Sequence, residues 1–326
     1  MSKTSIEWSP DTRMNRCRVN GATMGTRYDV QFYAPLHVDV KALAAELETA
    51  VCAVDNQMSN WKPDSDLSRL NRTAPGFWAP VSANLAAVLV RALEIGHETD
   101  NAFNIGVGEL VDAWGFGPAS ARRIDPKGAS DQAPILPVSA LLEVDIQQCR
   151  ARRHAEVALD LCGIAKGFGV DELASVLDRH GLSSWLVGID GEMRARGRKP
   201  DDSLWAIAVE APDYAQRAAI SVIELGNAAI ATSGDYRHWA DIDGMRISHT
   251  MDPRTGSPLH GEIASVTVIA PNCTDADAYA TALMVLGMKE GRALAVQRNL
   301  DALFIVRGGG AFHTIATGCF ADATPP

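Results

Sequence analysis

The sequence lacks the patterns of several common protein classes. None of its six cysteines belongs to a CxxC pair, which argues against a structural zinc site. A chain of 326 residues with 47% hydrophobic residues can bury a sizeable core, so a disulfide framework is not expected either. The segment 1–20 contains no apolar run, and the sequence as written predicts neither a signal peptide nor a membrane helix.

Basic residues are outnumbered by acidic residues. Thirty Lys and Arg residues face forty Asp and Glu residues, which gives a formal net charge of −10. An acidic chain has no general attraction for phosphate backbones or anionic lipid, so we expect no nucleic-acid binding. A phosphorylated ligand would need a metal ion or a few well-placed basic groups to neutralise it.

Standard nucleotide-binding loops are missing as well. The stretch "GIAKGFG" fits neither GxGxxG nor the Walker loop, which argues against a Rossmann dehydrogenase or a P-loop enzyme. Hydrophobic periodicity predicts helices and strands without a regular βαβ alternation, and this mixture indicates an α+β fold. The predicted helices cover 39–58, 83–98 and 168–180; the predicted strands cover 27–33, 183–189, 205–211, 219–225 and 264–270, followed by a hairpin over 302–316. A surface loop is expected over 118–137.

The segment "LDLCGIAKGFGVDELASVL" places a glycine-rich turn between a short apolar strand and a helix. Backbone N–H groups at such a junction favour an anion, and Lys166 would add a full positive charge. The alternative is a simple strand–helix turn in which glycine supplies the backbone freedom.

The segment "CTDADAYATAL" also allows two interpretations. Thr274 and Asp277 have the spacing of a capping box at a helix start. Asp277 and Thr281, however, lie four residues apart on one helical face, and both carry the oxygen atoms that a hard cation such as Mg²⁺ prefers.

Three further segments combine polar and aromatic residues. In "SHTMDPRTGSP", His249 precedes a predicted tight turn and is either a structural residue or a general base. Trp61 in "MSNW" either stacks on a planar ring or anchors a loop. "ATSGDYRHW" is predicted to be a polar loop, with a solvated turn as the simplest interpretation.

Seven segments of the chain, taken in order, resemble the ApbE-type FAD:protein FMN transferases. The resemblance runs from Gly21 to the C-terminal hairpin. The segments are MGT, MSNWKPDSDLSRLN, VGELVDAWGFG, DLCGIAKGFGVD, TSGDYR, HTMDPRTGSP and ADAYATAL.

This resemblance implies an α+β fold with a duplicated T-fold-like core, mixed or antiparallel sheets and flanking helices. It implies an N-terminal tail over 1–20 and a transferase domain over 21–322 built from two intertwined lobes. The implied enzyme uses Mg²⁺ to cleave FAD and attaches FMN to a Thr or Ser of a target redox protein, such as a membrane electron-transport subunit, with release of AMP.

Site residues follow from the resemblance, position by position. Metal binding is implied for Asp277, Thr281 and the carbonyl of Gly163. We take His249 as the base for the acceptor hydroxyl, with Asp252 as a candidate to orient it. FAD contacts are implied for Met24, Trp61, Ala102, Phe103, Asn104, Asp160, Lys166 and Thr250.

The chain departs from the family pattern at two positions. Asn104 stands where aspartate is usual, so a change in FAD affinity or ring orientation is expected, and Glu109 replaces a usual proline. The usual lipoprotein leader is absent, so we expect a cytoplasmic protein as written, or a periplasmic inner-membrane lipoprotein if a leader was removed. Two other functions stay open: FAD pyrophosphatase, giving FMN and AMP, and a non-catalytic FAD carrier.

Overall fold

The computed structural model describes residues 5–10, 14–118, 135–212, 218–236, 239–242, 245–309 and 311–322. The surface loop expected over 118–137 falls largely outside them. Among the described residues, no helix combines the length and the apolar character needed to cross a bilayer.

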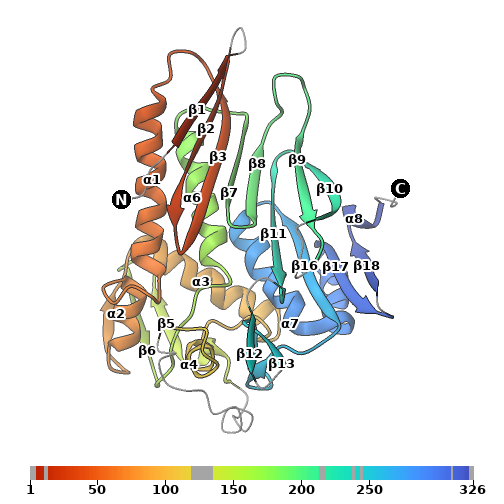
Figure 1. Ribbon diagram of the computed structural model, residues 1–326. Helices are drawn as coiled ribbons and strands as arrows, with labels where there is room; N and C mark the ends of the chain where they lie inside the picture. The colour runs from red at the N-terminus through yellow and green to blue at the C-terminus, as the bar shows by residue number, and fades with distance from the viewer. Residues whose placement is uncertain are drawn as a thin grey trace.

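A nine-stranded sheet forms the centre of the molecule (Figure 1). Every pair of neighbouring strands in it is antiparallel. From edge to edge the strands are β1 (Ser5–Pro10), β2 (Asn15–Thr23), β3 (Thr26–Ala34), β7 (Trp185–Ile189), β8 (Glu192–Arg196), β11 (Ala228–Gly234), β16 (Ile263–Ala270), β17 (Asp301–Gly308) and β18 (Ala311–Thr317). Residues 15–20, expected in a tail, instead lie in β2, so the sheet begins before residue 21.

Three long helices pack on this sheet, and the second of them also packs against the other two. They are α1 (Val40–Met58), α6 (Ala165–Arg179) and α7 (Cys273–Gln297). The apolar stripe predicted for 39–58 is buried in α1. Helix α6 begins three residues earlier than predicted and is followed by Gly181 at φ +68°. The prediction of an α+β fold is confirmed.

Smaller helices and strands surround the sheet and the three long helices. Helix α3 (Ala83–Glu98) has the predicted bounds, and its N-cap is Ser82, whose hydroxyl accepts a hydrogen bond from the Leu85 amide. The hairpin of β9 (Trp205–Glu210) and β10 (Ala219–Leu225) packs apolar side chains on the sheet. The remaining elements are α2 (Asp66–Arg72), β4 (Trp78–Pro80), α4 (Gly108–Ala113), η1 (Val138–Ala140), β5 (Leu142–Asp145), β6 (Arg150–Arg153), β12 (Trp239–Ile242), β13 (Met245–Ser248), β14 (Met251–Asp252), β15 (Ser257–Pro258) and α8 (Cys319–Asp322).

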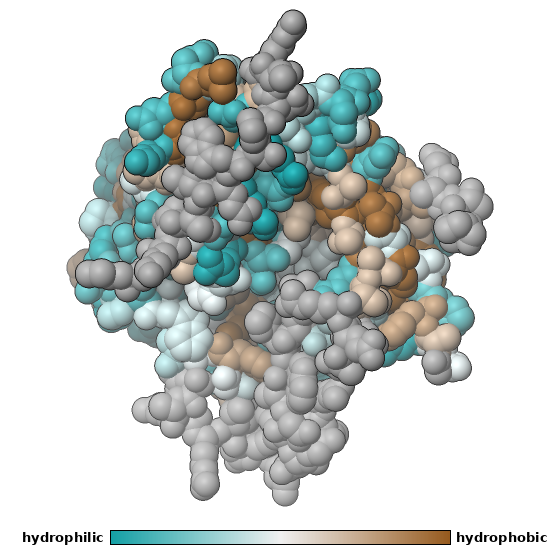
Figure 2. Space-filling view, turned by 45° about the horizontal axis from the view of Figure 1, so that its top comes forward, coloured by the Kyte–Doolittle hydropathy of each residue, from teal (hydrophilic) through white to brown (hydrophobic). Residues whose placement is uncertain are grey.

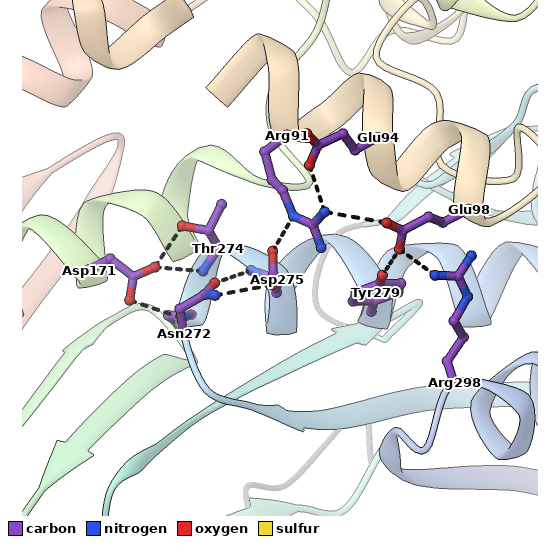
Figure 3. A network of polar contacts seen from close by, with 10 residues as sticks. Arg91, Glu94, Glu98, Asp171, Asn272, Thr274, Asp275, Tyr279 and Arg298 are labelled. Carbon is purple, nitrogen blue, oxygen red and sulfur yellow. Dashed lines mark hydrogen bonds and ion pairs between the residues drawn. The ribbon is translucent and has the colours of Figure 1, made fainter. Parts of the chain in front are cut away.

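The N-terminus of α7 is fixed by side chains from two other helices (Figure 3). The Asp171 carboxylate on α6 accepts hydrogen bonds from the amides of Cys273 and Thr274 and from the Thr274 hydroxyl. Arg91 on α3 bonds the Asp275 carboxylate at 2.7 Å.

The helix cap expected at Thr274 is wrong by two residues. Asn272 is the N-cap, and its side chain accepts from the Asp275 amide. Asp277 does not form a capping box with Thr274, because its carboxylate accepts a hydrogen bond from the Gly167 amide on α6, at 2.9 Å. Asp277 is therefore not part of the helix cap, and the interpretation of Asp277 and Thr281 as cation ligands stays open.

Gly167 lets α6 and α7 approach closely. A Cβ atom at this position would lie 2.8 Å from the Cβ of Asp277 and closer still to the Cys273 carbonyl. The obstacle is largely backbone, which cannot rotate away as a flexible side chain can. The helix crossing therefore requires glycine here.

We predict that Gly167→Ala lowers the free energy of unfolding by about 1–3 kcal/mol, because it overpacks the crossing. The control is Gly261→Ala, where a Cβ meets nothing within 4 Å and which should change stability by no more than about 0.5 kcal/mol. Urea unfolding measures both. Equal midpoints for the two variants would show that the crossing has room to adjust.

Candidate functional site

A large cavity opens where the β7–β8 turn, the first turn of α6 and the N-terminal half of α7 meet. Its volume is about 870 Å³, in the range of small-molecule and cofactor sites. Figure 2 shows the face of the molecule hollowed near its centre, with hydrophobic side chains along one side. Asp252, the candidate to orient His249, does not line the cavity, but the other twelve residues predicted for the site do: Met24, Trp61, Ala102, Phe103, Asn104, Asp160, Gly163, Lys166, His249, Thr250, Asp277 and Thr281.

Asp160 sits at the start of the glycine-rich turn. Its carboxylate is buried and accepts hydrogen bonds from the Cys162 amide at 2.7 Å and from the Asn60 side chain at 2.6 Å. Burial raises the pKa of Asp160, and the bonds from Cys162 and Asn60 oppose this rise. The carboxylate therefore holds the turn and the Trp61 loop together at the cavity wall.

The first turn of α6 carries the positive charge that the anion interpretation requires. Its N-cap residue, Ile164, makes no side-chain capping bond, and the Gly167 amide of this turn donates to the Asp277 carboxylate. Lys166 stands in this turn, and its ammonium lies 2.8 Å from the Glu192 carboxylate and 3.6 Å from Asp190. Desolvation alone would lower the pKa of Lys166, but Glu192, Asp277 and Asp190 together raise it, so the side chain is a cation.

The three groups predicted to hold a metal lie together. A Cβ at Gly163 would be 3.3 Å from the Thr281 hydroxyl oxygen. Asp277, one helical turn before Thr281, is only 4% exposed. Burial, followed by repulsion from Glu192, raises the pKa of Asp277 to about 7.

This set fits a hard cation. Carboxylate, hydroxyl and carbonyl oxygens are the ligands that Mg²⁺ prefers, usually one or two carboxylates together with substrate phosphates. A nearby cation would favour the charged form of Asp277, which burial and Glu192 otherwise disfavour. The described residues contain no group of three or more His, Cys, Asp or Glu side chains arranged to hold a metal ion by themselves.

His249 lies on the cavity wall, in edge-on contact with Phe116 at 6.4 Å between ring centroids. Asp252 does not orient it, contrary to the expectation. The Asp252 carboxylate accepts from the Arg254 backbone amide and from its guanidinium, at 2.9 to 3.1 Å. Arg254 also donates to the Val285 carbonyl, next to a kink in α7 at Gly287, so the turn is tied to the helix that carries Asp277.

Trp61 stands at the rim of the cavity with 62% of its surface exposed. An indole this exposed contributes little as a loop anchor. The geometry leaves its ring available to a planar ligand.

Three functional candidates were missed by the sequence analysis. Asn60 precedes Trp61 and binds Asp160, and Glu192 follows a predicted strand and binds Lys166. Ser233, in the TSGD segment, lies 2.9 Å from the Thr281 hydroxyl. The solvated turn expected there is wrong, because β11 continues to Gly234 and Asp235 pairs with Arg307.

Comparison with known proteins agrees with this geometry. A model of the ApbE family matches residues 24–304. An FAD:protein FMN transferase of Vibrio cholerae is 36% identical over 304 residues, which cover 93% of this chain and 91% of the relative. One of Escherichia coli K12 is 33% identical over 306 residues, 91% and 86% of the two chains.

The fold matches solved structures as well. The crystal structure of the apo form of Pseudomonas stutzeri flavinyl transferase ApbE superposes with a TM-score of 0.85 at 34% identity and covers 96% of this chain and 98% of that one. The Vibrio cholerae flavin transferase ApbE gives 0.82 at 34% identity, covering 95% and 99%. The chain belongs to the ApbE family.

Proposed function

We propose that this chain is a Mg²⁺-dependent FAD:protein FMN transferase. The observation that carries the proposal is that the twelve cavity-lining residues predicted for the site come together in one cavity, although they belong to segments spread between residues 24 and 281. The activity for which its relatives are named supports it. The proposed acceptor is a Thr or Ser hydroxyl of a redox protein, such as an electron-transport subunit of a membrane complex.

The reaction exchanges one phosphorus–oxygen bond for another. The acceptor oxygen bonds to the phosphorus of the FMN half of FAD, and the bond from that phosphorus to the bridging oxygen breaks, so AMP leaves with that oxygen. The acceptor hydroxyl loses a proton. His249 on the cavity wall is the residue proposed to take it.

The charge of the pyrophosphate has to be offset inside an acidic protein. The Lys166 ammonium in the first turn of α6 supplies part of this positive potential. When bound, Mg²⁺ would neutralise the charge that develops on the phosphate oxygens. Asp277, Thr281 and the Gly163 carbonyl are the groups that would hold it.

Incubation with FAD, Mg²⁺ and peptides that carry candidate acceptor threonines, read by mass spectrometry, tests the proposal. FMN-peptide together with AMP supports it. Free FMN and AMP without FMN-peptide would favour hydrolysis, and unchanged FAD would favour the carrier.

The carrier alternative rested on Asn104, and the structure explains this residue in another way. Its side-chain amide donates to the Asn101 side chain at 2.9 Å and to the Leu136 carbonyl at 3.1 Å, and its oxygen accepts from the Gly106 amide at 2.7 Å. A carboxylate could make only the last of these bonds. Asn104 thus joins two loops at the cavity wall.

Asn104→Asp should therefore lower the free energy of unfolding by about 1–3 kcal/mol, since a buried carboxylate would face two acceptors. Asn56→Asp is the matched control: Asn56 is exposed and accepts a bond from Lys62, which a carboxylate also accepts. Urea unfolding measures both variants. If Asn104→Asp is as stable as the parent, the amide is not needed for the loops.

The raised pKa of Asp277 predicts a pH-dependent stability in the absence of divalent cations. The carboxyl has a pKa of 3.8 as a reference and about 7 in the fold. The folded state therefore binds more protons between these values, and stability falls as pH rises through them. The parent should lose up to about 4 kcal/mol relative to Asp277→Asn between pH 4 and pH 8.

Adding Mg²⁺ at pH 8 should restore the parent and leave Asp277→Asn unchanged. Thermal unfolding of both proteins at several pH values measures this. A constant difference between them across the pH range would contradict the buried-carboxylate assignment.

His249→Ala should slow FMN transfer to the acceptor roughly 10²–10⁴-fold, because the acceptor hydroxyl loses its base. FAD affinity should change much less, since the base acts on the acceptor. Slow hydrolysis should persist, because water can pass its proton to solvent. Transfer at the parent rate would remove His249 from the mechanism, and a parallel loss of FAD affinity would place it in the binding wall.

A further inference from the structure

Glu192 has no role in the reaction described so far, yet it is one of the most deeply buried charged residues. It lies at the start of β8 and is 3% exposed. One carboxylate oxygen accepts from Lys166 at 2.8 Å, and the other accepts from the Gly191 amide at 3.2 Å. Burial of a charged carboxylate is unfavourable in free energy. The ion pair with Lys166 offsets this penalty and stabilises Glu192 in its charged form.

Lys166 has a second acid nearby. Its neighbour Gly167 donates its amide to Asp277, which brings the Asp277 carboxylate to the same turn of α6. The charge of Asp277 contributes to the raised pKa of Lys166. Lys166 nevertheless forms its ion pairs within 4.0 Å with Glu192 and Asp190 and not with Asp277, among the residues described.

A lysine paired with Asp277 would compete with a metal ion. The ammonium would neutralise the one carboxylate in the proposed ligand set and would occupy its oxygen atoms. A long flexible side chain with four rotatable bonds can move between neighbouring acids at little cost. A specific interaction is therefore needed to keep Lys166 paired with an acid other than Asp277.

We propose that Glu192 is a positioning residue that holds Lys166 away from Asp277 and thereby keeps Asp277 free to bind a divalent cation. The inference rests on the metal-dependent function proposed above. It assigns to the Glu192–Lys166 pair the role of setting cation affinity, which is separate from any contact that Lys166 makes with FAD.

The test is the binding of Mn²⁺ to the FAD-free protein, measured by electron paramagnetic resonance of the free ion. Glu192→Gln should weaken binding about 10–100-fold, as is typical when a partner behind a metal ligand is lost. Lys166→Met alone should change affinity little, because Glu192 already holds the lysine. The double variant should bind nearly as tightly as the parent, because the competing ammonium is gone.

A general effect of charge gives a different pattern. If the two residues act independently through their charges, the effects of the single variants add up in the double variant. Additive effects, or unchanged affinity in Glu192→Gln, would overturn the inference. Glu143→Gln removes one negative charge outside the cavity lining and should leave Mn²⁺ binding unchanged.

Two controls keep the outcome interpretable. Thermal unfolding shows whether Glu192→Gln is folded; if it is not, Glu192→Asp should give the same pattern with a smaller amplitude. A parent protein that binds no Mn²⁺ would overturn the proposed metal site itself. Tight binding by the parent together with equal binding by every variant would overturn only the role of Glu192.

Discussion

The close crossing of α6 and α7 is the constraint on which the rest of the site depends. Gly167 allows the backbone of one helix to meet the other, and its amide bonds the Asp277 carboxylate. Asp171, four residues further along α6, holds the first two amides of α7. The glycine-rich turn, its lysine and the Asp277–Thr281 pair are thus placed by two packed helices rather than by mobile loops.

The crossing concentrates negative charge around a single lysine. Asp190, Glu192 and Asp277 all contribute to the raised pKa of Lys166, and burial disfavours the ionised form of Asp277. Holding these acids close together costs stability, because burial and repulsion from Glu192 both disfavour the charged form of Asp277. In the function proposed above, the same charges would favour a divalent cation, and the cation together with Lys166 would bind the pyrophosphate. An acidic protein could in this way bind a phosphorylated substrate without an overall excess of basic residues.

Helices could be predicted from the sequence where contacts between residues close in sequence determine them. The apolar stripe of α1 and the bounds of α3 depend on residues within a few positions of each other, and both were placed correctly. The strand at 15–23 was missed because its pairing partners, not its own composition, define it. The α7 cap was misplaced because Asn272 and Thr274 suit the role equally well in sequence, and the Asp171 carboxylate that binds Thr274 lies 103 residues away.

The residues of the candidate site were predicted from motifs, but the bonds that hold them were not. Glu192 carries no recognisable pattern, and its partner Lys166 is 26 residues distant. The roles of Asp252 and Asn104 were judged from residue type alone. The structure shows that Asp252 serves Arg254 and that the Asn104 amide makes two donations, which only three-dimensional neighbours could reveal.

We propose that the α6–α7 crossing builds a cation site beside the pyrophosphate of FAD. Anomalous diffraction from crystals soaked with Mn²⁺ and FAD tests it most directly. We predict a manganese peak in contact with the Asp277 carboxylate, the Thr281 hydroxyl and the Gly163 carbonyl, with FAD phosphate oxygens completing the coordination. FAD bound in the cavity with no manganese at Asp277, or with manganese at other residues, would contradict the account.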